Sequence, residues 1–185
     1  MDTRKQITTW VDTNREDLIE TANEIFKHPE ISLEEKTSSK ILADYLEKQG
    51  FTVTWGIAGF ETAFVAEWGY GKPVLGFLAE YDALPGLGQE TCSTRKAIEG
   101  PGHGCGHNLL GTACAGAAGA LKSWMETEEK EGTIRVYGCP AEEIVIGKIR
   151  MNEAGVFDDL SAAITWHPFD RNRVSYDIWQ AQDIK

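Results

Sequence analysis

Histidine, cysteine and paired carboxylates gather in two short stretches of this 185-residue chain. The first stretch is His103-Gly104-Cys105-Gly106-His107, in which two imidazoles and a thiol stand among glycines. Imidazole and thiolate are good ligands for zinc and similar metals, and the glycines let a loop turn Cys105 and His107 toward one centre. The alternative is a glycine-rich turn with a buried cysteine, because free cysteine is often a simple core residue.

The second stretch is Glu142-Glu143, which follows a segment rich in strand-forming residues. Beside a metal ion, one carboxylate can bind the ion while the other takes a proton from water and passes it to a leaving amine. The alternative is two acidic residues in the first turn of a helix, where the helix dipole favours negative charge. Spacing alone does not separate these interpretations.

Three more polar residues follow apolar segments. Glu80 and Asp82 come after residues 73–79, and His167 comes after residues 161–166. His167 is a candidate third ligand, and a carboxylate in the Glu80–Asp82 segment can orient a ligand histidine through a hydrogen bond. The alternatives are a structural histidine and a solvated turn.

Hydrophobic spacing predicts the elements that must position these residues. Helices are predicted over residues 12–27, 33–49, 108–125 and 143–154. Strands are predicted over residues 51–55, 62–68, 73–79, 133–139 and 161–166. Residues 83–106 hold six glycines and two prolines, which predicts a long loop of the kind that often serves function.

Alternating strands and helices predict an α/β fold with a mixed, mostly parallel sheet and helices on both faces. The site of such a sheet lies beyond the carboxyl ends of its strands, where the candidate residues fall. Residues that can bind a metal follow one strand or helix end after another along the chain. A single metal centre explains this order better than four unrelated occurrences do.

Composition excludes several classes of protein. The chain has 18 Lys+Arg against 29 Asp+Glu, a net charge of −11, which argues against nucleic-acid and anionic-membrane partners. The sequence contains no run of 18 consecutive apolar residues, so no membrane-spanning helix is predicted. The charged N-terminus also lacks the apolar core of a signal peptide. We therefore expect a cytoplasmic protein, with Cys92, Cys105, Cys114 and Cys139 not paired in disulfides.

These motifs, in this order, resemble the zinc-type aminoacylase and carboxypeptidase family of metallo-amidohydrolases, and within it the p-aminobenzoyl-glutamate hydrolase type. The resemblance rests on residues 71–87, 102–113, 137–143 and 155–168, with weaker matches over 28–35 and 50–59. It implies a zinc-exopeptidase-like catalytic domain.

The resemblance also implies roles for individual residues. The implied metal ligands are Cys105, His107, Glu143 and His167, with Glu142 as general base and Asp82 as a supporting aspartate. The role of Glu80 stays open, because many relatives carry a ligand histidine there. The implied cofactor is a divalent metal (zinc, manganese, cobalt or nickel), with one or two ions.

The implied reaction is hydrolysis of an amide by metal-activated water, with Glu142 carrying the proton to the departing amine. The implied substrates are N-acyl-amino acids, small peptides or aminobenzoyl-glutamate, and homo-oligomerisation is left open. The alternative is a truncated, non-catalytic metal-binding or interaction module. A redox thiol protein is disfavoured, because no two cysteines have redox-pair spacing.

The sequence departs from the family in two places. Residues 144–148 read Ile-Val-Ile-Gly-Lys where relatives are richer in glycine. Family members also continue into a lid-like domain and then return with another ligand histidine. We therefore expect residues 1–185 to be the N-terminal portion of a catalytic domain, inactive alone and open at one sheet edge, with a strand over residues 174–185.

Overall fold

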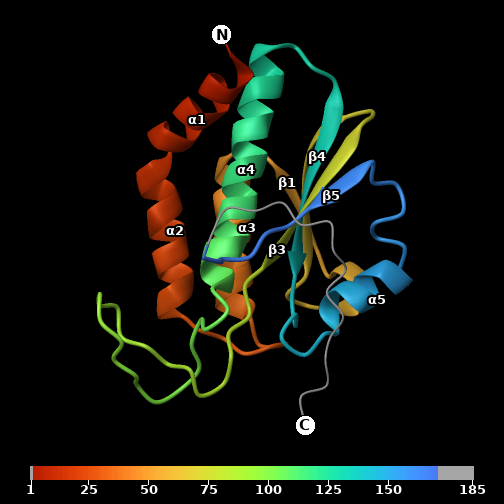
Figure 1. Cartoon of the computed structure of the whole chain (residues 1–185). Coiled ribbons are helices and arrows are strands. Elements are labelled where there is room, and N and C mark those ends of the chain that lie inside the picture. The colour runs from red at the N-terminus through yellow and green to blue at the C-terminus, as the bar shows by residue number, and fades with distance from the viewer. Residues whose placement is uncertain (1, 171–185) are drawn as a thin grey trace.

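Five strands form one sheet among residues 2–170, the part of the chain that the computed structural model describes (Figure 1). The spatial order is β1-β2-β4-β3-β5. The strands are β1 (Thr52–Trp55), β2 (Phe64–Tyr70), β3 (Val74–Glu80), β4 (Gly132–Cys139) and β5 (Ala162–Ile164). β2 pairs antiparallel with β1 and β4, whereas β3 pairs parallel with β4 and β5. The sheet is mixed, as predicted.

Helices cover both faces of this sheet (Figure 1). The helices are α1 (Thr3–Thr13), α2 (Arg15–Lys27), α3 (Lys36–Lys48), α4 (His107–Thr127) and α5 (Gly147–Glu153), with a short 3-10 turn η1 (Ile57–Gly59). α4 packs on β3 and β4 and is itself flanked by α1, α2 and α3, while α5 lies across the sheet from them. The predicted α/β class with two covered faces is confirmed.

Two apolar clusters hold the layers together. The larger one fills the space between α2–α4 and the sheet, and Leu42, Leu110 and Ile134 are fully buried in it. The smaller one lies on the α5 side and joins Tyr137 of β4 to Met151 of α5. Burial of side chains of this size contributes roughly 1.5–3 kcal/mol each, so both faces of the sheet are fixed by packing.

The small residues of α4 let its first turns approach the end of β3. A Cβ added to Gly111 would lie 2.5 Å from the backbone oxygen of Glu80, so only glycine fits this contact. Gly106, just before the helix, has φ +82°, a left-handed conformation that glycine adopts readily. The two glycines together place His107 directly over the carboxyl end of β3.

The predicted elements are found with shifted ends, and one helix was missed. α1 escaped prediction because it is polar and has no buried residue, and its C-terminal cap Asn14 separates it from α2. α5 begins at Gly147 rather than 143, because residues 141–146 form a tight turn with positive φ at Ala141 and Val145.

Residues 83–106 contain no helix or strand, which confirms the predicted loop. Cys114 and Cys139 are buried thiols and Cys92 is exposed. β5 is an edge strand of the described sheet, and its residues are exposed. The strand predicted over residues 174–185 lies outside the described residues.

No helix within residues 2–170 combines the length and apolar character needed to cross a bilayer.

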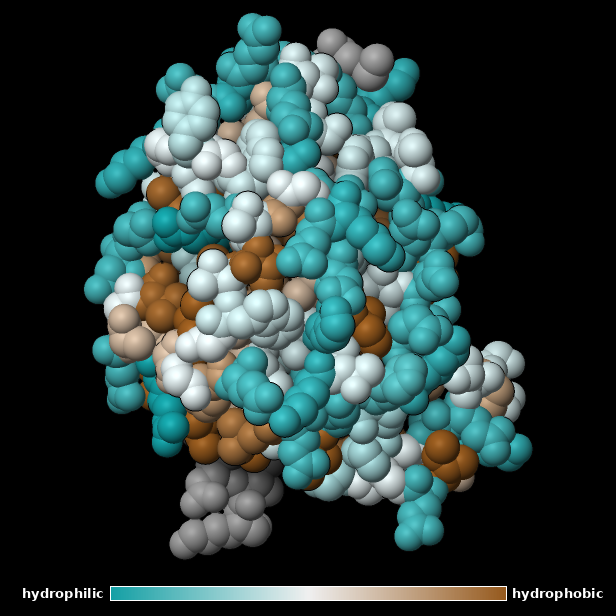
Figure 2. Space-filling model, turned by 180° about the vertical axis from the view of Figure 1, so that it is seen from behind, coloured by the Kyte–Doolittle hydropathy of each residue, from teal (hydrophilic) through white to brown (hydrophobic). Residues whose placement is uncertain are grey.

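On the face drawn in Figure 2, hydrophilic residues cover most of the surface and hydrophobic residues show in separate patches. Among the exposed apolar side chains, Ile144 and Val145 follow Glu143 directly and Trp166 precedes His167. Apolar groups open to solvent therefore stand beside the acidic and imidazole groups in the chain.

The close approach of α4 to β3 predicts a contrast between two glycine substitutions. Gly111→Ala should lower the free energy of unfolding by about 1–3 kcal/mol, because its Cβ meets backbone that cannot move aside. Gly116→Ala should be neutral or stabilising, since its Cβ meets only the flexible end of Leu18 and alanine favours a helix. Urea unfolding monitored by circular dichroism measures both, and equal stability of the two variants would contradict the packing argument.

Candidate metal centre

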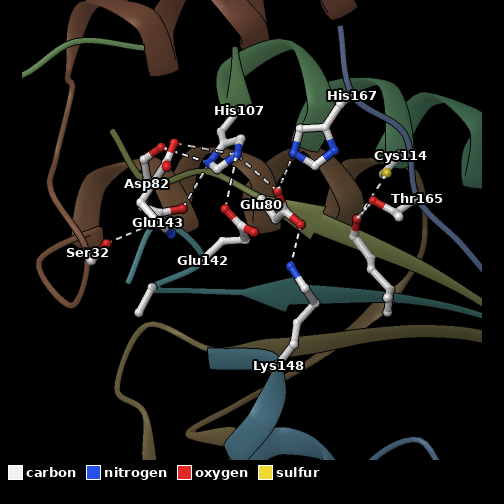
Figure 3. Close-up of polar contacts among 12 residues, drawn as sticks. Ser32, Glu80, Asp82, His107, Cys114, Glu142, Glu143, Lys148, Thr165 and His167 are labelled. Carbon is white, nitrogen blue, oxygen red and sulfur yellow. Dashed lines mark hydrogen bonds and ion pairs between the residues drawn. The ribbon is translucent and has the colours of Figure 1, made fainter. Parts of the chain in front are cut away.

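The carboxyl ends of β3, β4 and β5 and the first turn of α4 meet at one place (Figure 3). β3 and β4 run parallel in a register that pairs Glu80 with Cys139, so both strands end at the same level. The residues that follow β4 and β5 therefore reach the same edge of the sheet. The side chains that meet there are Glu80, Asp82, His107, Glu142, Glu143 and His167.

His107 lies at the middle of this group and is completely buried. Its Nδ1 lies 3.0 Å from Asp82 Oδ1 and 3.0 Å from the Asp82 backbone oxygen. Its Nε2 lies 3.0 Å from Glu80 Oε2, 3.7 Å from Glu142 Oε2 and 3.8 Å from Glu143 Oε1. A histidine that ligates a metal through one nitrogen commonly donates its other N–H to a carboxylate, and the contact between Nδ1 and Asp82 is of this kind.

Asp82 fixes more than the imidazole. Its Oδ2 accepts hydrogen bonds from Ser32 Oγ at 2.8 Å and from the backbone N–H of Glu143 at 3.0 Å. Burial alone would raise the pKa of Asp82. The hydrogen bonds from His107, the Glu143 backbone and Ser32 outweigh this effect and lower the pKa. One buried carboxylate thus aligns His107 with the segment that carries the paired glutamates.

Two overlapping groups of side chains could hold a metal ion, and both contain His107. Cys105, His107 and His167 form one group, and Glu80, His107 and Glu142 form the other, each with ligand atoms within 4.8 Å of one another. Thiolate, imidazole and carboxylate are ligands that zinc, manganese, cobalt and nickel accept in proteins. The donor set therefore fits a divalent ion.

Unsatisfied polar atoms concentrate at the same place. Among the described residues, seven buried side-chain nitrogen or oxygen atoms have no hydrogen-bond partner. Three of them are Glu80 Oε2, His107 Nε2 and Glu143 Oε1, which all face this centre. Buried polar groups are rarely left without a partner, so the convergence of these three atoms fits coordination of a cation.

Charge at the centre also favours a cation. Burial alone would lower the pKa of His107, but its hydrogen bond with Asp82 and the adjacent Glu80 carboxylate raise it to about 11. Burial raises the pKa of the Cys105 thiol and of Glu143, and an adjacent cation would offset this effect by favouring their deprotonated forms. The acidic groups thus favour positive charge at the imidazole, and an ion that binds Nε2 displaces the proton from it.

The structure brings the predicted site residues together, with Cys105 half-buried, His107 buried and His167 exposed. His103, which belongs to the same glycine-rich motif, points elsewhere. Its Nε2 lies 3.3 Å from the backbone oxygen of Ile25, and burial lowers its pKa to about 4. The motif therefore sends only two of its three donor side chains toward the centre.

Glu35 also supports the centre and was not predicted from the sequence. Glu35 is fully buried, and its Oε1 accepts the backbone N–H groups of Leu33 and Ala141, each at 2.8 Å. Because Ala141 immediately precedes Glu142, Glu35 holds the start of the turn that presents the paired glutamates. Its position within residues 28–35, a stretch that matched the family, was the signal that could have found it.

Comparison with known proteins places this arrangement in a family. The model of peptidase family M20/M25/M40 matches residues 76–178, more than half of the chain. The chain belongs to this family. The resemblance drawn from the sequence motifs is therefore confirmed.

Two curated M20 relatives show related chemistry by name. Over 161 residues the chain is 48% identical to one subunit of the p-aminobenzoyl-glutamate hydrolase of Escherichia coli, covering 85% of this chain and 34% of that protein. It is 33% identical to human Xaa-Arg dipeptidase over 164 residues, covering 80% of this chain and 34% of the dipeptidase. The chain thus spans about a third of the length of these relatives.

A solved structure of the M20 family shares the fold. The crystal structure of a Bacillus subtilis protein, described as a dinuclear metal binding peptidase, superposes with a TM-score of 0.65 at 27% identity. The match covers 82% of this chain and 42% of that protein. The sheet and helices described above are therefore part of the architecture of M20 peptidases.

The contacts of Asp82 generate a prediction about metal affinity. Asp82→Asn should weaken Zn²⁺ binding about 10–100-fold, since an amide nitrogen cannot accept the N–H groups that the carboxylate holds. Calorimetric titration with Zn²⁺ measures the affinity, with exposed Asp44→Asn as the matched control. Unchanged affinity in a folded Asp82→Asn protein would remove Asp82 from the centre.

Proposed function

We propose that this chain carries the metal centre of an enzyme that hydrolyses amide bonds. The observation that supports the proposal most is the setting of His107. Its Nδ1 is held by Asp82 and its Nε2 faces the carboxylates of Glu80, Glu142 and Glu143 at 3.0–3.8 Å. Membership of a peptidase family supports the same class of reaction.

The proposed metal ligands are Cys105, His107, Glu143 and His167. Support comes from the grouping of Cys105 with the two histidines and from the buried, unpartnered Glu143 Oε1. A bound divalent ion supplies a lowered pKa for water and polarisation of the substrate carbonyl. Zinc, manganese, cobalt and nickel all suit this donor set, and the Bacillus subtilis relative described as dinuclear supports a site for two ions.

Glu142 is the proposed general base. The side chain of Glu142 is 30% exposed, whereas that of Glu143 is only 16% exposed. The backbone N–H of Glu143 also donates a hydrogen bond to Asp82. Glu142 can therefore reach a substrate while Glu143 stays fixed toward the ion. Glu142 takes the proton of the attacking water and returns it to the departing amine.

The proposed substrates are small amides in which an acyl or aroyl group is joined to an amino acid. The names of the two relatives support this class, since one is an aminobenzoyl-glutamate hydrolase and the other a dipeptidase. Ile144 and Val145, which follow Glu143, are 47% and 67% exposed, so they offer an apolar surface to an acyl group.

Substitution of the proposed base separates catalysis from metal binding. Glu142→Gln should lower the hydrolysis rate of p-aminobenzoyl-glutamate or an N-acetyl-amino acid by about 10²–10⁴-fold and leave the metal content unchanged. Cys105→Ser should instead lower the metal content, because it removes a proposed ligand. Elemental analysis measures the metal content of residues 1–185, and an amine-release assay measures the rate of the zinc- or manganese-loaded longer enzyme in which these residues are proposed to form the N-terminal portion.

Three outcomes are informative. Undiminished hydrolysis by Glu142→Gln would exclude Glu142 as the base. Metal bound in stoichiometric amount without hydrolysis of any such amide, in the longer enzyme as well as in residues 1–185, would favour a non-catalytic metal-binding module instead. A folded protein that takes up no metal would overturn the proposal altogether.

A further inference from the structure

Lys148 places a positive charge beside the acidic centre from the opposite face of the sheet. It is the second residue of α5, and its Nζ forms an ion pair with Oε1 of Glu80 (Figure 3). Glu80 is 1% exposed, and the side chain of Lys148 is 31% exposed. Although burial alone would lower the pKa of Lys148, the adjacent Glu80 carboxylate raises it, so the lysine stays charged.

The other oxygen of Glu80 points at both histidines. Glu80 Oε2 lies 3.0 Å from His107 Nε2 and 3.3 Å from His167 Nε2. Metal–ligand bonds of about 2.0–2.1 Å at tetrahedral angles separate neighbouring ligand atoms by about 3.3 Å. The distances from Glu80 Oε2 to the two imidazole nitrogens therefore suit neighbouring ligands of one ion, and Glu80, His107 and Glu142 form a group whose ligand atoms all lie within 4.8 Å of one another.

Glu80 Oε2 is also a buried atom without a hydrogen-bond partner, as is His107 Nε2. Lys148 occupies Oε1 alone, so it does not satisfy the second oxygen. Glu80 Oε2 and His107 Nε2 lie 3.0 Å apart and neither has a hydrogen-bond partner of good geometry, so a cation that replaces the imidazole proton can bind both atoms.

We propose that Glu80 is a further ligand of the metal centre, binding through Oε2, and that Lys148 is the residue that positions it. This inference rests on the metal site proposed above and extends it to two residues that were not assigned a role there.

Lys148 has two effects on the carboxylate. By holding Oε1 it prevents Glu80 from rotating away and restricts it to binding through one oxygen. Its charge also offsets one of the four carboxylates at the centre, namely those of Glu80, Asp82, Glu142 and Glu143. A buried carboxylate left without any partner is strongly destabilising, so the pair keeps the centre intact before an ion binds.

A double variant distinguishes a ligand from a structural partner of Lys148. Glu80→Gln removes the ligand oxygen's charge but leaves a lysine without its partner, so loss of metal could reflect misfolding. Glu80→Gln combined with Lys148→Met removes both charges, and replacing both members of a buried pair is often neutral for stability. If Glu80 binds the ion, affinity stays low in the double variant, whereas a purely structural pair predicts recovery.

The experiment is calorimetric titration of the purified protein with Zn²⁺, together with the visible spectrum of the Co²⁺ complex, which reports the number and type of ligands. Glu80→Gln and the double variant should each lose at least about a hundredfold in affinity and change the Co²⁺ spectrum. Lys148→Met should lose about 10–100-fold, the usual cost of an outer partner, and Lys148→Arg should recover most of it. Exposed Lys40→Met and Glu61→Gln serve as matched controls.

Each outcome decides the matter. Wild-type affinity and an unchanged Co²⁺ spectrum in the double variant would overturn the role of Glu80. If Cys105→Ser weakens binding while Glu80→Gln does not, the proposed metal site stands and this extension of it fails. If the wild-type protein binds neither Zn²⁺ nor Co²⁺, both proposals fail together.

Discussion

The burial of one imidazole among four carboxylates is the constraint on which the site depends. His107 is inaccessible to solvent, and its two nitrogens face acidic groups on opposite sides. Charges are costly to bury unless each is paired, so the position of every neighbouring side chain matters. The backbone contact at Gly111, which admits no side chain, brings α4 close enough to β3 for this pairing to form. A change in helix packing would therefore act directly on the chemistry of the site.

The paired glutamates depend on a turn that is itself held by buried groups. Ala141 and Val145 both have positive φ, which is unfavourable for residues with a side chain. Glu35 accepts the N–H of Ala141, and Asp82 accepts the N–H of Glu143, so two buried carboxylates stabilise the first half of the turn. Such supported strain is common at functional sites, where it presents side chains in a fixed orientation.

The two faces of the sheet contribute differently to the centre. The α4 side supplies His107 and excludes water through the larger apolar core, while the α5 side supplies Lys148, whose charge reaches Glu80 at the end of β3. His167 approaches from β5, an exposed edge strand of the described sheet. The most buried side chain of the centre, His107, thus comes from a well-packed helix, and the more exposed His167 follows the edge strand.

The sequence by itself determined the fold class, the long loop, the candidate residues at strand ends and the family, because hydrophobic period and motif order are local properties of the chain. It did not reveal α1, whose polar surface gives little periodic signal, or the true start of α5, which depends on the strained turn before it. Only the tertiary structure decided that His103 turns away while His107 turns inward. It alone joined Lys148 to Glu80, because residues 68 positions apart meet only when the sheet and α5 pack together.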